Sequence, residues 1–168
     1  DIDLGGNVTV EATAINNDIN ATSATATAYL FATAQWGDLT VNGDVLVTAY
    51  AEQNAPTEGD STTYALASAD LYAWSNITVN GNVTVEAIAI NNAYSASSAT
   101  ASAYLTANAV NADLSITGDI LVSAYALENG PINGTEEALA YASADLDAGS
   151  DIDLGGNVTV EATAINND

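Results

Sequence analysis

The 168-residue sequence contains no lysine, arginine, histidine, cysteine or methionine. Without cysteine there can be no disulfide bond and no thiolate metal site. Without lysine and arginine no ion pair can form between side chains, and the 22 Asp and Glu residues leave a formal net charge of −22. Nucleic acids and anionic membrane surfaces attract basic side chains, so neither is expected as a partner.

Long apolar runs are missing too. No run approaches the ~20 apolar residues of a membrane-spanning helix, so we expect no membrane insertion. Catalysis would have to use carboxylates, Ser, Thr and Tyr alone, because His, Cys and Lys are absent. We therefore predict that the protein is not an enzyme. A carbohydrate-active enzyme with paired carboxylates is the remaining catalytic alternative.

What the chain does have is an internal repeat. Residues 1–18 read DIDLGGNVTVEATAINND, and residues 151–168 are identical to them. Related segments begin at residues 38, 76 and 113. We therefore predict a single continuous repeat array over residues 1–168, cut from a longer one. Its units are 1–37, 38–75, 76–112, 113–150 and 151–168, the last being the start of a further unit.

Every unit alternates apolar and polar residues with period two, which is typical of half-buried strands. In the first unit Val8 and Val10 face one way, and Thr9 and Glu11 face the other. Two all-β folds fit this pattern. One is a parallel β-solenoid (β-helix) of stacked 37- or 38-residue units. The other is a row of antiparallel β-sandwich domains of about 75 residues, in which Asn42-Gly43 is a tight hairpin turn.

Aligning the units favours the solenoid. The predicted inward columns are uniform, as in Val10, Val47, Val85, Val122 and Val160. Some outward columns alternate in charge: Glu11, Thr48, Glu86, Ser123 and Glu161 form one, and Tyr29, Asp70, Tyr104 and Asp145 form another. Like charges that face each other across strands are destabilising, so alternation suits stacked coils. At ~4.8 Å per coil the array is about 20 Å long if each unit is one coil, and about 40 Å if each is two.

The motif G-(N/D)-(V/I)-x-V-x-A-x-A occurs at residues 6–14, 43–51, 81–89, 118–126 and 156–164. It resembles the repeat regions of large secreted adhesins of the filamentous-haemagglutinin and leukotoxin-like filamentous group. The resemblance covers nearly the whole chain. It implies a right-handed β-helical shaft, secretion to the cell surface or beyond, and a role in attachment.

Two sets of residues are candidate sites. Carboxylate oxygens suit Ca²⁺ or Mg²⁺, and weak binding is predicted at a set that recurs with the repeat: Asp1, Asp3, Asp38, Asp113, Asp151 and Asp153. A solvated acidic face is the other interpretation of these residues. Sequons for N-glycosylation in an exported protein begin at Asn7, Asn20, Asn76, Asn82, Asn133 and Asn157.

The predicted function is that of a structural shaft segment of a long extracellular surface or matrix filament, in adhesion or in cell–cell and biofilm scaffolding. Its expected partners are neighbouring copies of the same filament and cell-surface glycans. The main alternative is an adhesin repeat that binds a glycan or a divalent cation. Ice binding through outward threonines such as Thr9 and Thr13 is a weaker alternative, because Leu46 and Tyr50 interrupt their columns.

Overall fold

The computed structural model describes residues 1–54, 61–93, 97–129 and 137–167. Among these residues every regular element is a strand, and there is no helix. Each complete unit contributes a short strand, a nine-residue strand and a strand of 12 or 13 residues. The strands of successive units stack into three parallel sheets.

Sheet A contains the short strands β1 (Ile2–Leu4), β4 (Leu39–Val41), β7 (Ile77–Val79), β10 (Leu114–Ile116) and β13 (Ile152–Leu154). Sheet B contains β2 (Val8–Asn16), β5 (Val45–Gln53), β8 (Val83–Asn91), β11 (Ile120–Glu128) and β14 (Val158–Asn166). Sheet C contains β3 (Ser23–Ala34), β6 (Ser61–Ala73), β9 (Ser97–Ala109) and β12 (Glu137–Ala148).

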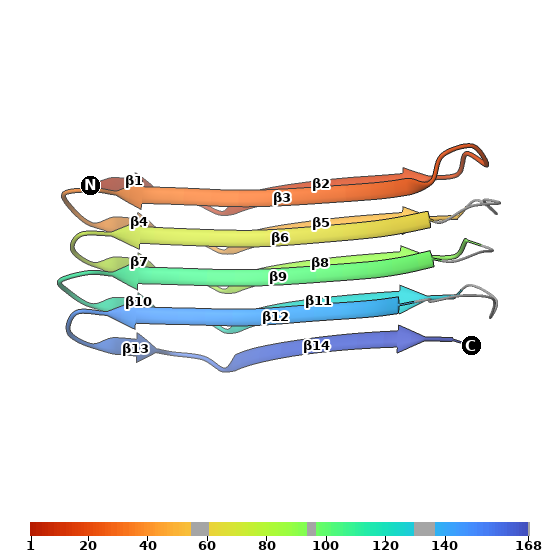
Figure 1. Ribbon diagram of the computed structural model, residues 1–168. Coiled ribbons are helices and arrows are strands. Elements are labelled where there is room, and N and C mark those ends of the chain that lie inside the picture. The colour runs from red at the N-terminus through yellow and green to blue at the C-terminus, as the bar shows by residue number, and fades with distance from the viewer. Residues whose placement is uncertain (55–60, 94–96, 130–136, 168) are drawn as a thin grey trace.

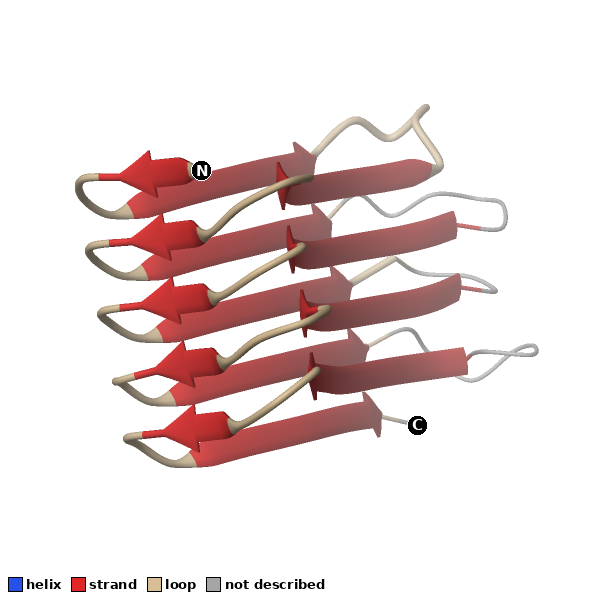
Figure 2. Ribbon diagram, turned by 90° about the vertical axis from the view of Figure 1, so that its left-hand side faces the viewer, coloured by secondary structure: helices blue, strands red, loops and turns tan. Residues whose placement is uncertain are grey.

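The chain therefore forms a parallel β-solenoid of about four turns, with one coil for each 37- or 38-residue unit. Sheets B and C lie face to face, and sheet A closes one narrow side (Figures 1 and 2). Seen from the N-terminal end, the chain runs clockwise as it recedes, so the coil is right-handed (Figures 1 and 2). Right-handed crossovers between parallel strands are nearly universal, so the hand does not identify a family.

The sandwich alternative is wrong. Asn42-Gly43 lies between β4 and β5, which pair with strands of neighbouring coils and belong to different sheets. Within sheet B the predicted columns are confirmed, because Val10 pairs with Val47, Val47 with Val85 and Val85 with Val122. The solenoid prevails because every strand between the two ends finds a parallel partner on both sides, so its backbone groups are paired.

The core is sorted by side-chain size. The large buried residues lie near sheet A, where three sheets meet: Leu39 and Val41 of sheet A, Val47 of sheet B and Leu71 of sheet C. Farther along, where only sheets B and C face each other, alanines fill the space between them: Ala49, Ala51, Ala65, Ala67 and Ala69. Because alanine fills little volume, the coil narrows away from sheet A.

Glycine is required at the corner between sheets A and B because successive coils approach closely there. A Cβ added to Gly81 would lie 2.5 Å from the carbonyl oxygen of Gly43, and one added to Gly118 would lie 2.6 Å from that of Gly81. No described glycine has a positive φ, so close packing and not backbone conformation selects glycine at these positions.

One predicted column in sheet C is wrong by two residues. Tyr29 pairs with Ser68, and Ser68 pairs with Tyr104. Asp70 instead pairs with Phe31 of the preceding coil and with Thr106 of the following coil. The segments that join sheet B to sheet C differ in length between coils, and a shift of two residues leaves every side chain on the same face of the sheet. The alternation of the sequence therefore could not reveal this error.

Candidate functional site

Four of the six predicted metal ligands and four of the six sequon asparagines lie at corners of the coil, where they form ladders of hydrogen bonds between coils. The first Asx ladder contains the residue before each short strand: Asp1, Asp38, Asn76, Asp113 and Asp151. In each step the side-chain Oδ1 accepts a hydrogen bond from the backbone N–H of the next ladder residue, at 3.0 to 3.2 Å. These side chains therefore continue the backbone ladder around a corner where the strands are interrupted.

The second Asx ladder lies at the next corner, just before each strand of sheet B. It contains Asn7, Asp44, Asn82, Asp119 and Asn157. The backbone N–H of Asp44 donates to Oδ1 of Asn7 at 2.9 Å, and the three following steps measure 2.8 Å each. The two Asx ladders are thus built in the same way.

Hydrogen bonds from N–H groups contact the ladder carboxylates, since the chain has no basic residue. Asn and Asp alternate throughout the second ladder, whereas Asp1 bonds directly to Asp38, and Asp113 to Asp151, in the first. Nδ2 of Asn82 donates to Oδ1 of Asp44 at 3.2 Å, and Nδ2 of Asn76 donates to Oδ1 of Asp38 at 3.0 Å. The hydrogen bond from the Asn76 backbone, followed by one from Ser75, holds the pKa of Asp38 below its ordinary value. Hydrogen bonds to the charged form of a carboxylate have this effect. Backbone and amide N–H groups thus supply the stabilisation that cations supply elsewhere.

The structure separates the remaining predicted metal ligands. Asp3 and Asp153 are exposed on the outer side of sheet A, at opposite ends of the stack, with Thr40, Thr78 and Ser115 between them. Oδ1 of Asp3 accepts a hydrogen bond from Nδ2 of Asn42 at 2.9 Å. Within the described ranges no group of three or more acidic side chains lies close enough together to hold a metal ion. Binding of Ca²⁺ or Mg²⁺ at these residues stays a prediction.

The sequons fall into two structural classes. Asn7, Asn76, Asn82 and Asn157 belong to the Asx ladders, and Nδ2 of Asn76, Asn82 and Asn157 donates to a neighbouring aspartate. A glycan on Nδ2 would remove one of its two donors. Asn20, by contrast, is exposed in the connection between β2 and β3, and its local bonds go to Asp18. Asn133 lies outside the described residues. Asn20 is therefore the described sequon asparagine that lies outside the ladders.

A third ladder and a buried polar layer at the far end of sheet B were not predicted. The asparagine ladder contains Asn17, Asn54, Asn92, Asn129 and Asn167, and each Nδ2 donates to the Oδ1 of the preceding coil. Beside it lie the inward ends of the strands, including Gln53, Asn91 and Glu128, all fully buried. Asn91 Nδ2 donates to Ser61 Oγ and to the Ser98 carbonyl, both at 3.1 Å.

The signal for this polar layer is visible in the sequence. Each sheet B strand ends with an amide or acidic residue at an inward position, where the pattern calls for an apolar one. Buried amides of this kind satisfy the backbone of the connecting segment, as Gln53 does by donating to the Ala21 carbonyl at 3.1 Å. The layer therefore ties the end of sheet B to the segment that leads into sheet C.

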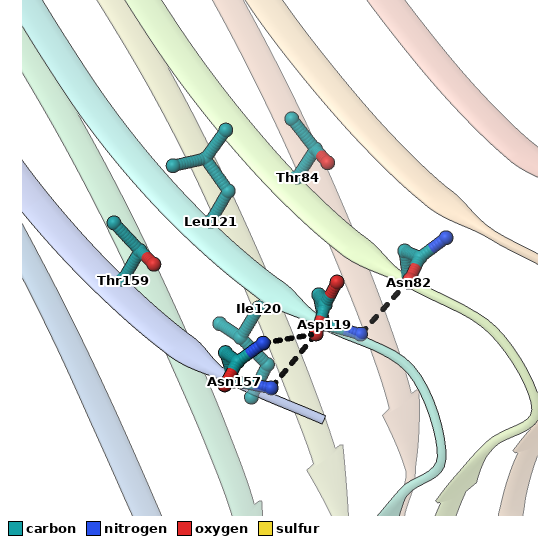
Figure 3. Close-up of a pocket in the computed structure, with 7 residues that line it drawn as sticks. All are labelled: Asn82, Thr84, Asp119, Ile120, Leu121, Asn157 and Thr159. Atoms are coloured by element: carbon teal, nitrogen blue, oxygen red, sulfur yellow. Dashed lines mark hydrogen bonds between the residues drawn. The ribbon is translucent and has the colours of Figure 1, made fainter. Parts of the chain in front are cut away.

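A shallow pocket of about 390 Å³ opens at the start of strands β8, β11 and β14 (Figure 3). Its lining includes Asn82, Thr84, Asp119, Leu121 and Thr159. Asp119 is its one carboxylate, and the Oδ1 atom of that side chain already accepts two hydrogen bonds from Asn157. The pocket thus offers hydroxyl, amide and aliphatic contacts, and it lacks the pair of carboxylates that glycoside hydrolysis uses.

The outer faces of the two long sheets differ in chemistry. On sheet B, Glu11, Glu86 and Glu161 recur in every second coil, and the hydroxyl of Tyr50 donates to Glu52 at 2.7 Å. This hydrogen bond raises the pKa of Tyr50. On sheet C the large exposed side chains are Tyr29, Phe31, Tyr64, Tyr104 and Tyr141. At the turn that follows sheet C, the rings of Trp36 and Trp74 lie 5.8 Å apart.

The comparisons do not add a function. No family model, no curated protein and no solved structure matches this chain. The resemblance to filamentous adhesins therefore stays a prediction. In the described part of the chain no helix has the length and apolarity to cross a membrane.

Proposed function

We propose that this chain is a non-catalytic shaft segment of a long extracellular surface or matrix filament, which serves adhesion or the scaffolding of cells and biofilm. The observation that carries the proposal is the unbroken register between coils. Residues 151–166, which repeat residues 1–16, continue sheets A and B with the same pairing as the coils before them. A further copy of the 150-residue repeat can follow without a seam.

The energetics of stacking favour length. Each added coil pairs its strands with the coil before it and extends the same core, so stability in such arrays grows with the number of repeats. The three ladders add hydrogen bonds at every step, including those at the corners where strands are interrupted. An acidic surface of uniform sign keeps the filament soluble, and its partners would be neighbouring copies or glycans.

The test is the length of engineered arrays. Proteins that contain one, two and three copies of residues 1–150 should appear in electron micrographs as particles of constant cross-section that lengthen along one axis only. Each copy adds four coils, so the length should increase by about 19 Å per copy at ~4.8 Å per coil. Beads on a string, or particles that grow equally in all directions, would contradict the shaft.

A second candidate function is the binding of a glycan. It is favoured by one surface, the outer face of sheet C.

A further inference from the structure

The central part of the outer face of sheet C carries no charge, although the chain has 22 acidic residues. Three adjacent outward columns make up this surface, which we call the hydroxyl face. They are Thr25, Tyr64, Thr100 and Leu139; Thr27, Leu66, Ser102 and Tyr141; and Tyr29, Ser68, Tyr104 and Ser143. Every side chain except the two leucines carries a hydroxyl group. The outer face of sheet B has no charge-free area of this kind.

Large side chains cover part of the hydroxyl face. Ser102 points outward, yet only 5% of it is exposed, because large side chains such as Leu66 and Tyr141 flank it in its column. The rings themselves remain accessible, with 61% of Tyr29 and 50% of Tyr141 exposed. Burial, together with the nearby Tyr29 and Tyr104, raises the pKa of Tyr64.

Charge restricts what can bind here. Glu137, Asp70 and Asp145 border the hydroxyl face, so an anionic polymer would be repelled by them and by the net charge of the chain. A second copy carries the same charge. The face measures about 20 Å along the strands and about 19 Å across four coils, or ~400 Å². A stable protein interface needs roughly 800 Å² per partner, so a neutral ligand fits better than a second copy.

The chemistry matches a sugar polymer. Tyrosine rings offer flat apolar area that packs on the C–H faces of sugar rings, and their hydroxyl groups bond to polar partners. Surfaces of Tyr and Ser are also effective in recognition generally, because these rigid rings lose little entropy and the small hydroxyls adapt. The four strands of sheet C stack one above another with little twist in Figure 1, so the face suits a ribbon-shaped polymer better than a helical one.

The spacing of two tyrosine rings along the solenoid indicates the direction in which a bound polymer would lie. Tyr29 and Tyr104 occupy one column with a serine between them, so their rings recur every second coil, about 9.6 Å apart at ~4.8 Å per coil. In a β-1,4-linked polysaccharide alternate sugar rings face the same way. We propose that the hydroxyl face binds a neutral β-1,4-linked polysaccharide whose chain lies along the axis of the solenoid.

This site depends on sheet C and not on the length of the filament, so the proposal and the shaft can fail independently. The experiment is affinity electrophoresis of the 168-residue protein in gels that contain hydroxyethylcellulose or carboxymethylcellulose, together with sedimentation with cellulose and chitin. The two soluble polymers share one backbone, but only the second is anionic. We expect retardation by hydroxyethylcellulose, and roughly tenfold weaker retardation by carboxymethylcellulose at low salt.

The test variant is Tyr29→Ser with Tyr104→Ser, and the matched control is Tyr50→Ser with Tyr125→Ser on sheet B. Each pair removes two outward rings that recur at the same offset of 75 residues. The test variant should lose roughly tenfold or more in affinity for hydroxyethylcellulose, while the control keeps its affinity. Circular dichroism and thermal melting of both variants establish that they are folded.

Several results would overturn the proposal. They are no binding to hydroxyethylcellulose, cellulose or chitin, equal retardation by the anionic polymer, and equal loss in the control. Sedimentation velocity tests the alternative occupant of the hydroxyl face, a second copy of the chain. If the protein self-associates and the Tyr29→Ser, Tyr104→Ser variant does not, the hydroxyl face is a contact between copies. Rods of the expected length together with no polysaccharide binding would reject the ligand and leave the shaft standing.

Discussion

Sheets B and C face each other across one core, but they use their two surfaces differently. Inside, sheet B presents valines followed by alanines, whereas sheet C presents alanines with a single leucine toward the corner, as in Leu71 followed by Ala73. Outside, sheet B carries Glu11 and Glu86 in every second coil, whereas the hydroxyl face of sheet C is uncharged. The inner faces must fit each other to close the coil. The outer faces carry no such constraint, and this is where function can differ.

The largest expected effect is the difference in stability between a charge placed on the inner face of sheet B and one placed on its outer face. Val85 is fully buried, so Val85→Asp should cost about 4 kcal/mol or more, because it places an unpaired charge in the core. Its neighbour Thr84 points outward, and Thr84→Asp should cost no more than about 1 kcal/mol. Urea denaturation of both variants measures the difference. Equal costs would show that the assignment of faces is wrong.

The next largest loss of stability is expected in the alanine-filled part of the core. Ala67 is fully buried where sheets B and C approach, and Ala67→Leu should cost about 1–3 kcal/mol by overpacking. Ser68→Leu adds a similar side chain on the outer face of the same strand and should change stability by less than about 1 kcal/mol. Thermal melting compares the two. Tolerance of leucine at residue 67 would mean that the sheets can separate.

A smaller effect tests the alternation of charge on sheet B. Thr48 lies between Glu11 and Glu86, so Thr48→Glu should cost about 0.5–1 kcal/mol through like-charge contacts on both sides. Thr100 lies between Tyr64 and Leu139 on sheet C, and Thr100→Glu should cost less. Since salt screens exposed charges, 1 M NaCl should remove most of the difference. A difference that persists in salt would point to packing and not to charge.

The smallest effect concerns the corner that joins the sheets. The pKa of Asp38 is lower in the folded protein than its ordinary value of 3.8. Its stabilising contribution is therefore complete above that value, and it declines as the pH falls through the folded-state pKa. The melting temperature should fall more steeply between pH 5 and pH 2 in the native protein than in Asp38→Asn, whose Oδ1 can still accept the Asn76 N–H. Parallel curves would contradict this role.

Much of the fold was predictable because the segments that form sheets A and B repeat regularly. Residues 1–17 and the matching segments at 38, 76 and 113 align without gaps, so the columns of sheet B follow from the sequence. Sheet C follows connections of unequal length, and its register is set by pairing with neighbouring coils. For this reason the sequence alone predicts Tyr29 beside Asp70, whereas in the structure Tyr29 pairs with Ser68.

The candidate sites show the same division. The acidic and asparagine columns were visible in the sequence, where carboxylates suggested a cation and Asn-x-Thr suggested a glycan. The structure gives the same residues another role, because each Oδ1 accepts the backbone N–H of the coil that follows, as Asp44 does for Asn82. Spacing alone could not reveal this bond, since it joins residues 38 positions apart.

The sequence by itself determined that the protein is a repeat of alternating strands, which side chains point inward, and that no basic group offsets its charge. These properties depend on local periodicity and composition, which recur in every unit. Only the tertiary structure decided that one unit makes one coil, which residues are neighbours on sheet C, and how hydrogen bonds satisfy the corner carboxylates. Those outcomes depend on pairing between coils, which two-residue periodicity leaves open.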